Sequence, residues 1–141
     1  MTKQIVFINP TVQDQQILLQ GIDPAIEIVH LDDNQDGLKQ IADHMTKQRE
    51  VDAIHIICHG APGTLHLGSA VVTPDNLKFY TVALAHVGRA LSEGGDILVY
   101  GCEAAAGERG ATLIEQFARL TGANVASSTA RVGLGNWALE G

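Results

Sequence analysis

The sequence is poor in aromatic residues, cysteine and positive charge. Only three Phe, two Tyr and one Trp stand among 141 residues, too few for the stacked aromatic platforms that bind single-stranded nucleic acid. Nine Lys and Arg face sixteen Asp and Glu, so the net charge is 9 − 16 = −7, whereas duplex binding needs clustered cations. Two cysteines exclude a disulfide scaffold and a four-cysteine zinc site. We therefore expect no nucleic-acid partner.

Long hydrophobic runs are also absent. No apolar run approaches the roughly 20 residues of a membrane-spanning helix, and the N-terminal MTKQIVFINP lacks the apolar centre of a signal peptide. We expect no membrane span, and the residues leave the compartment open. The chain is nevertheless 45% hydrophobic and only 18% charged, which excludes intrinsic disorder and a coiled coil.

The length and the alternation of patterns predict one α/β domain over 1–141. Apolar segments predict strands at 4–9, 25–31, 52–58, 96–101, 123–127 and 136–140. Helical spacing predicts helices at 12–20, from Leu38, from Thr73-Pro74 through Leu91, and at 113–120 with a stop at Gly122. A hairpin is expected at 64–73. Strands that alternate with helices are typical of a sandwich around a mostly parallel sheet. Because the chain ends in strand-like sequence, we expect it to be part of a longer protein.

An acidic loop follows the second predicted strand. Asp32, Asn34, Asp36 and Gly37 occupy calcium-loop positions, with Asp43 in place of the final Glu. A strand rather than a helix precedes this loop, so we favour a polar turn that caps the helix from Leu38. Calcium stays an alternative, and no other cofactor is expected.

The chemistry of an open α/β sheet gathers beyond the carboxyl ends of its strands. If the strands at 52–58 and 96–101 are neighbours, about 4.8 Å apart, His59 and Cys102 leave the sheet at one edge. An imidazole and a thiol so placed can act as base and nucleophile. The N–H groups of Gly60 and Cys102 are candidate oxyanion donors. Other residues at strand ends are candidates for a substrate pocket: Asn9, Tyr100, Glu103, Ser127 and Ser128.

These motifs resemble a known superfamily. Apolar strands that end in His-Gly and in Cys, here AIHIICHG and ILVYGC, are similar to those of the caspase-like (clan CD) cysteine peptidases. The longer segments CHGAPGTLHLG and GDILVYGCEAAAGERG resemble a bacterial domain family of unknown function found at the N-terminus of large, repeat-containing surface or secreted proteins. The resemblance spans about Gln4 to Glu140.

The resemblance implies a caspase-like three-layer sandwich with strand order 2-1-3-4 and further strands at the edge. It also implies catalytic His59, nucleophilic Cys102, an oxyanion site at Gly60 and an extracellular or cell-surface location. Its substrate would be a peptide or protein, including the rest of its own polypeptide. Tyr100 stands where metacaspase-type relatives carry Asp and caspases carry Gln, so no substrate preference is implied.

Other interpretations compete with this one. The domain could keep the peptidase fold as a non-catalytic interaction or secretion-associated module. A flavodoxin-like ligand-binding domain is disfavoured because no glycine-rich phosphate loop follows the first strand. Glutamine-amidotransferase-like folds place Cys before His, whereas all six histidines here precede Cys102.

The remaining His and Cys residues have simpler explanations. Cys58 is expected to pack in the core on the face opposite His59, and His55 to be a hydrogen-bonded core histidine. A metal site of His55, Cys58, His59 and His66 is disfavoured because strand alternation divides these side chains between two faces. Gly107 and Gly110 indicate either a mobile loop after Cys102 or an ordinary connection.

Overall fold

The fold is described from a computed structural model, which covers residues 3–12, 19, 22–100 and 103–127. Its centre is a five-stranded sheet in the order β2-β1-β3-β7-β8, and all its pairings are parallel. The strands are β1 (Gln4–Ile8), β2 (Glu27–His30), β3 (Val51–Ile57), β7 (Leu91–Tyr100) and β8 (Asn124–Ser127). The expected mostly parallel α/β sheet is confirmed, with the order 2-1-3 followed by the two later strands.

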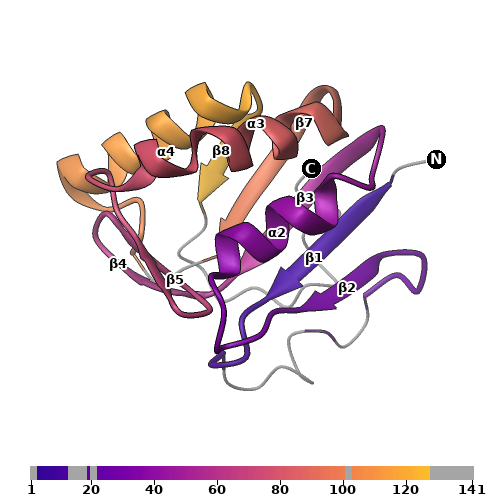
Figure 1. Ribbon diagram of the computed structural model, residues 1–141, viewed down its shortest axis with the longest axis horizontal. Coiled ribbons are helices and arrows are strands. Elements are labelled where there is room, and N and C mark those ends of the chain that lie inside the picture. Colours follow the sequence, from indigo (N-terminus) through magenta and orange to yellow (C-terminus); the bar gives the residue numbers. More distant parts are fainter. Residues whose placement is uncertain (1–2, 13–18, 20–21, 101–102, 128–141) are drawn as a thin grey trace.

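Three helices in the described part of the chain cover one face of this sheet (Figure 1). They are α2 (Gly37–Met45), α3 (Thr81–Ala90) and α4 (Gly107–Thr121). Strand alternation explains the arrangement, since Ile5 and Phe7 of β1 join the core beneath the helices while Val6 and Ile8 face the other side. The helix expected at 12–20 lies largely outside the described residues, and the strand expected at 136–140 lies wholly outside them.

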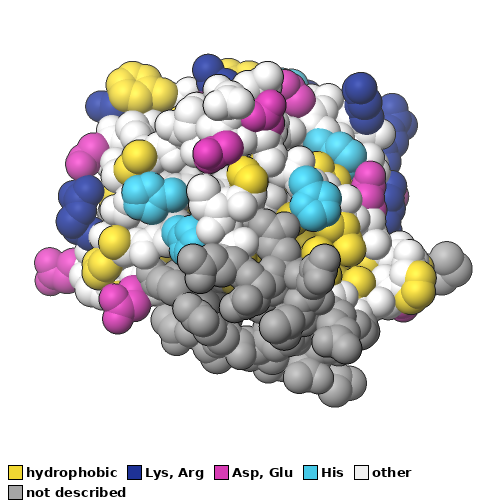
Figure 2. Space-filling view, turned by 90° about the horizontal axis from the view of Figure 1, so that it is seen from below, with side chains coloured by type: hydrophobic (Ala, Val, Ile, Leu, Met, Phe, Trp, Pro, Cys, Tyr) yellow, Lys and Arg dark blue, Asp and Glu magenta, His cyan; other side chains and the backbone are white. Residues whose placement is uncertain are grey.

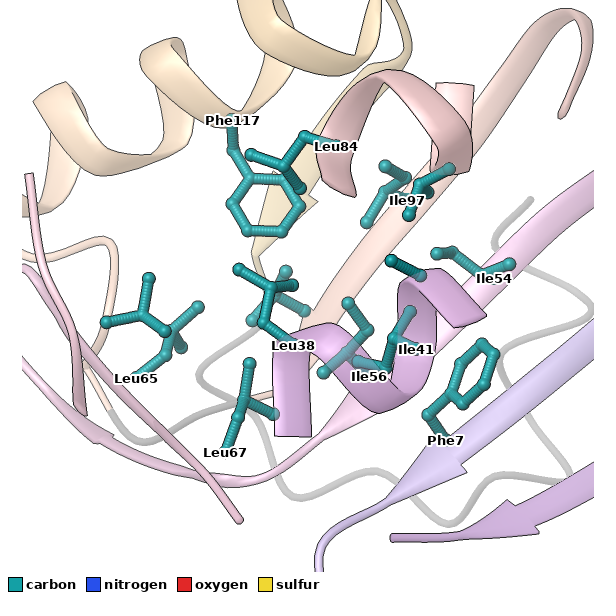
Figure 3. Close-up of a cluster of buried hydrophobic side chains, with 14 of the residues drawn as sticks. Phe7, Leu38, Ile41, Ile54, Ile56, Leu65, Leu67, Leu84, Ile97 and Phe117 are labelled. Carbon is teal, nitrogen blue, oxygen red and sulfur yellow. The ribbon is translucent and has the colours of Figure 1, made fainter. Parts of the chain in front are cut away.

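The main core brings residues from distant segments into contact. Leu84 of α3 and Phe117 of α4 lie above Ile97 of β7, and Phe7 of β1 closes the opposite end (Figure 3). Leu65 and Leu67 enter the same core from a second, smaller sheet. Each of these side chains is essentially inaccessible to solvent. The two sheets and the three helices therefore share one hydrophobic core, and its burial stabilises their packing against one another.

The smaller sheet is antiparallel and follows directly from β3. It consists of β4 (His59–Ala61), β5 (Thr64–Leu67) and β6 (Ala70–Val72) in that order. The β5–β6 hairpin confirms the expectation for 64–73, while β4 was not foreseen. His59 pairs with His66, and His66 pairs with Val71. These three residues are exposed, whereas Leu65, the neighbour of His66 on β5, is buried. The small sheet therefore has one outer and one inner face.

The prediction of a helix from Thr73 was wrong in its start and its end. A turn follows Thr73, then the 3-10 helix η1 (Leu77–Tyr80), and α3 begins only at Thr81. The Thr73 backbone N–H donates to Asn76 Oδ1 at 2.9 Å, so Asn76 organises a turn in place of the expected cap. Leu91 ends the helical pattern but belongs to β7, because a register shift between Val51 and Ala53 draws it into the sheet.

Two other local predictions have clear outcomes. The glycine-flanked segment after Cys102 is not a loop, because Gly107 and Gly110 lie in the first turn of α4. A Cβ at Gly110 would lie 2.2 Å from the carbonyl carbon of Ala105, so this glycine allows the preceding turn to pack closely. At the other end of α4, Gly122 adopts φ 75° and its N–H bonds to Ala118, which confirms the predicted glycine stop.

Gly88 sets the close approach of α3 to α4. A Cβ at this position would lie 1.9 Å from the carbonyl oxygen of Thr121. Replacing Gly by Ala inside a helix ordinarily stabilises a protein by about 1 kcal/mol. We expect Gly88→Ala instead to lower the free energy of unfolding by about 1–3 kcal/mol, because the helices must separate. Urea denaturation measures the change, and Val82→Ala on the exposed side of α3 is the control. A more stable Gly88→Ala protein would contradict this packing.

Candidate functional site

The two strands expected to carry the chemistry are neighbours. Ile57, at the end of β3, is in register with Tyr100, at the end of β7. The Cys58 N–H donates to the Tyr100 carbonyl at 3.1 Å, so the two strands stay together to their carboxyl ends. His59 follows Cys58, and Cys102 stands two residues after Tyr100 in the sequence. Cys102 itself lies outside the described residues.

His59 forms a hydrogen bond with a backbone carbonyl far away in the sequence. Histidine side chains are exposed at several points on the face shown in Figure 2, so exposure alone identifies no base. The Nε2 atom of His59 lies 2.9 Å from the carbonyl oxygen of Thr11, 48 positions earlier in the chain. A carbonyl can only accept, so Nε2 carries the proton and donates. In the neutral ring, Nδ1 is then a proton acceptor.

The loop that supplies this carbonyl is anchored by Asn9. The Asn9 side chain is 1% exposed; its Nδ2 donates to Thr11 Oγ1 at 2.6 Å, and its Oδ1 accepts from the Gly68 N–H at 2.8 Å. Asn9 is one of the substrate-pocket candidates expected from the strand ends, whereas Thr11 is not. No sequence pattern marks a backbone carbonyl, although the strand-end segment Asn9-Pro10 pointed to this part of the chain.

Cys58 and His55 lie where core residues were expected. Cys58 is 4% exposed and belongs to the cluster beneath the helices, which confirms its packing role. His55 is fully buried. Its Nε2 is 2.9 Å from Gln4 Oε1 and its Nδ1 is 3.3 Å from the Tyr100 hydroxyl. The expectation of a hydrogen-bonded core histidine is therefore confirmed.

The structure separates the members of the disfavoured metal set. His55 is buried in the central sheet, while His59 and His66 are exposed on the small one. Within the described ranges, no group of three or more His, Cys, Asp or Glu side chains is arranged to hold a metal ion.

The remaining pocket candidates lie in different surroundings. The Tyr100 ring stacks on His55 with a centroid separation of 5.9 Å. Glu103 is exposed and adopts φ 59°, the left-handed region that is uncommon for a residue with a side chain. The Ser127 hydroxyl oxygen is buried without a hydrogen-bond partner among the described residues, and Ser128 lies outside them. Gly60 is half-buried in β4 beside His59.

The acidic loop acts as a helix cap, as favoured. Asp36 is the N-cap of α2, and its Oδ1 accepts from the N–H groups of Leu38 and Lys39 at 3.0 and 3.1 Å. Its Oδ2 accepts from the Tyr80 hydroxyl at 2.7 Å. Burial and the hydrogen bond to Asp36 raise the pKa of Tyr80 to about 12. Both carboxylate oxygens of Asp36 therefore accept hydrogen bonds from other groups of the protein.

Comparisons with known proteins agree with the resemblance only at a coarse level. Residues 5–141 match the family described as "Domain of unknown function (DUF4347)". The chain belongs to this family. No curated protein matches the chain. A solved structure described as a small-chain dehydrogenase aligns with 98% of the domain and 89% of its own chain, at 13% identity and a TM-score of 0.49, which is too distant to carry an argument about function.

Membrane insertion through a helix finds no support in the described part of the DUF4347 domain, where no helix has the length and apolar character to cross a bilayer.

His55 should make the stability of the DUF4347 domain depend on pH. Burial lowers the pKa of His55 from 6.5 to about 4. The unfolded chain takes up a proton near pH 6.5 whereas the folded chain does not, so stability is full above pH 6.5 and falls as the pH drops toward 4. We expect the loss to reach about 3 kcal/mol.

Urea denaturation between pH 7 and pH 4 measures this loss. The matched control is His55→Asn, which keeps a donor and an acceptor but does not titrate. Carboxyl groups titrate in both proteins, so the difference between their slopes isolates His55. Equal slopes would contradict the predicted contribution.

Proposed function

We propose that the domain is a caspase-like cysteine endopeptidase in which His59 is the base and Cys102 the nucleophile. The observation that supports this best is the hydrogen bond between His59 Nε2 and the Thr11 carbonyl. It leaves Nδ1 as the proton acceptor on an exposed imidazole at the carboxyl end of β3. The adjacent strand β7 leads within two residues to Cys102.

Cys102 needs a base such as His59 to act as a nucleophile. An ordinary cysteine thiol has a pKa of about 8.5 and is largely protonated at neutral pH. A nucleophilic thiol therefore needs a base to take its proton, and the base needs a third group to orient it. In this proposal the Thr11 carbonyl is the orienting group. A carboxylate is not required for that role, because a carbonyl also accepts the Nε2–H and selects the same tautomer.

The proposed reaction begins with proton transfer from the Cys102 thiol to His59 Nδ1. The sulfur attacks the carbonyl carbon of a peptide bond, a C–S bond forms, and the carbonyl oxygen becomes an oxyanion that accepts N–H bonds from Gly60 and Cys102. The C–N bond then breaks, and His59 gives its proton to the leaving nitrogen. Water next attacks the thioester after losing a proton to His59, the C–S bond breaks, and the proton returns to the sulfur.

The proposed substrate is a peptide or protein, including segments of the longer polypeptide to which the domain would belong. The half-buried Gly60 lacks a side chain beside the base, so an extended peptide can approach there. Glu103, Tyr100, Ser127 and Ser128 remain candidates for contacts around the scissile bond.

Cleavage of a peptide library by the 141-residue chain tests the proposal. We expect Cys102→Ala to abolish cleavage and His59→Ala to lower kcat/KM by about 10²–10⁴-fold, the usual share of a positioned base. His66→Ala is the matched control, because His66 is exposed and lies opposite His59 in the β4–β5 pairing. It should retain the wild-type rate. Arms with and without calcium test the alternative metal dependence.

Thiol reactivity supplies an independent measurement. In Cys58→Ala protein the single remaining thiol is Cys102, and a neutral alkylating probe should label it faster than an ordinary thiol. His59→Ala should remove that advantage. If Cys102 reacts like an ordinary thiol and cleavage is the same in all variants, the peptidase proposal fails and the non-catalytic interaction module is favoured.

A further inference from the structure

We infer that Asn9 is a positioning residue that holds the Thr11 carbonyl against His59 and thereby selects the tautomer of the imidazole. The catalytic consequence rests on the proposed function, whereas the effect on the tautomer does not. This role differs from the substrate contact that the position of Asn9 at a strand end suggested.

The side-chain amide of Asn9 connects two segments that lie far apart in the sequence. Its Oδ1 accepts from the Gly68 N–H at 2.8 Å, and its Nδ2 donates to Thr11 Oγ1 at 2.6 Å. The Gly68 N–H can only donate, so it must face the amide oxygen, and the amide nitrogen is left for Thr11. The chemistry of the partners thus sets the orientation of the amide.

The backbone of Asn9 fixes the same loop to the end of β3. The Asn9 N–H donates to the Ile57 carbonyl at 2.8 Å, and the Asn9 carbonyl accepts from the Val12 N–H at 3.1 Å. Ile57 precedes His59 by two residues. The end of β3 therefore fixes both the backbone next to His59 and the loop that carries the Thr11 carbonyl. Pro10 lies between Asn9 and Thr11 and restricts the backbone of this turn further.

The Gly68 end of the connection is rigid as well. Gly68 lies in the turn between β5 and β6, with φ 59°, and a Cβ there would lie 2.1 Å from the Gln35 carbonyl oxygen. The next residue, Ser69, donates its N–H to that same carbonyl at 2.8 Å. Asn9 therefore ties the Thr11 loop to a turn that is itself packed against the loop after β2.

These contacts leave Asn9 poorly suited to contact substrate. Its side chain is 1% exposed, and both ends of its amide have partners. A substrate contact would have to break one of these bonds and leave a buried polar group unsatisfied. The physical role that remains is to limit the movement of Thr11, since a displacement of about 1 Å at a catalytic group can lower the rate about 10²-fold.

Nitrogen-15 NMR of the histidine side chains tests the inference without any substrate. In the wild-type chain at neutral pH, we expect His59 to be predominantly the Nε2–H tautomer. Thr11→Val removes the acceptor of the Asn9 amide but keeps the backbone carbonyl, and it should shift His59 toward a mixture of tautomers. Thr11→Ser keeps the hydroxyl and should retain the wild-type tautomer. Asn9→Ala should shift His59 as Thr11→Val does.

Two other histidines serve as controls in the same spectra. His66 pairs with His59 across the small sheet but forms no hydrogen bond with Thr11 among the described residues, so its signals should not follow the variants. His55 is buried with Gln4 and Tyr100, and its unchanged signals show that a variant is folded. Thr11 is exposed, so Thr11→Val keeps the test open even if Asn9→Ala fails to fold. An unchanged His59 tautomer in folded Thr11→Val would overturn the inference.

Cleavage assays separate this inference from the proposed function. If the domain is a peptidase, Thr11→Val should lower kcat about ten- to a hundredfold with little change in KM, and Thr11→Ser should restore it. A tautomer shift in a domain that cleaves no peptide would support the positioning role and overturn the peptidase proposal. A peptidase whose rate and tautomer are both unaffected by Thr11→Val would overturn the positioning role alone.

Discussion

Strand β3 pairs with a parallel neighbour on each edge and buries side chains on each face, and the rest of the structure is arranged around it. Ile54 and Ile56 pack beneath the helices, while His55 and Ile57 pack on the opposite side. A shift of this strand by one residue would move every side chain to the opposite face of the sheet and disrupt the packing on both faces. The position of His59 at its carboxyl end is therefore set by the hydrophobic core.

The small antiparallel sheet begins at His59, directly after the buried part of β3 and Cys58. Cys58 is still buried, whereas His59 is exposed, although the two residues are adjacent. The inner side chains of β5 fill the main core, and the outer face carries His59 and His66. The domain thus places an imidazole on a well-packed support without burying it. That combination suits a proton-transfer group, which needs both a fixed orientation and access to its partner.

Family membership defines the domain but not its activity. The DUF4347 match covers nearly the whole chain and names no activity. The neighbouring strands, the hydrogen bond to His59 and the thiol that follows β7 in the sequence support the proposed peptidase chemistry. The Thr11 carbonyl adds to this support, because an acceptor at Nε2 gives the His59 imidazole a defined tautomer.

Apolar runs and polar caps predicted much of this fold because they reflect local physics. The strands at 4–9 and 52–58 bury both faces, Asp36 caps α2 through neighbouring N–H groups, and Gly122 ends α4. The helix expected from Thr73 was misplaced because Leu77 and Tyr80 keep helical spacing within a 3-10 turn. Leu91 was assigned to the wrong element because pairing with Val51 draws it into β7.

The sequence by itself determined the parallel α/β class and the His and Cys motifs that resemble the caspase-like peptidases. Only the tertiary structure revealed that Thr11 holds His59 and that Asn9 holds Thr11. The Thr11–His59 bond joins residues 48 positions apart, the Asn9–Gly68 bond joins residues 59 positions apart, and each involves a backbone group that every residue other than proline has. A backbone carbonyl acquires a specific role only when folding brings it beside a particular side chain, so no pattern of residue types can reveal it.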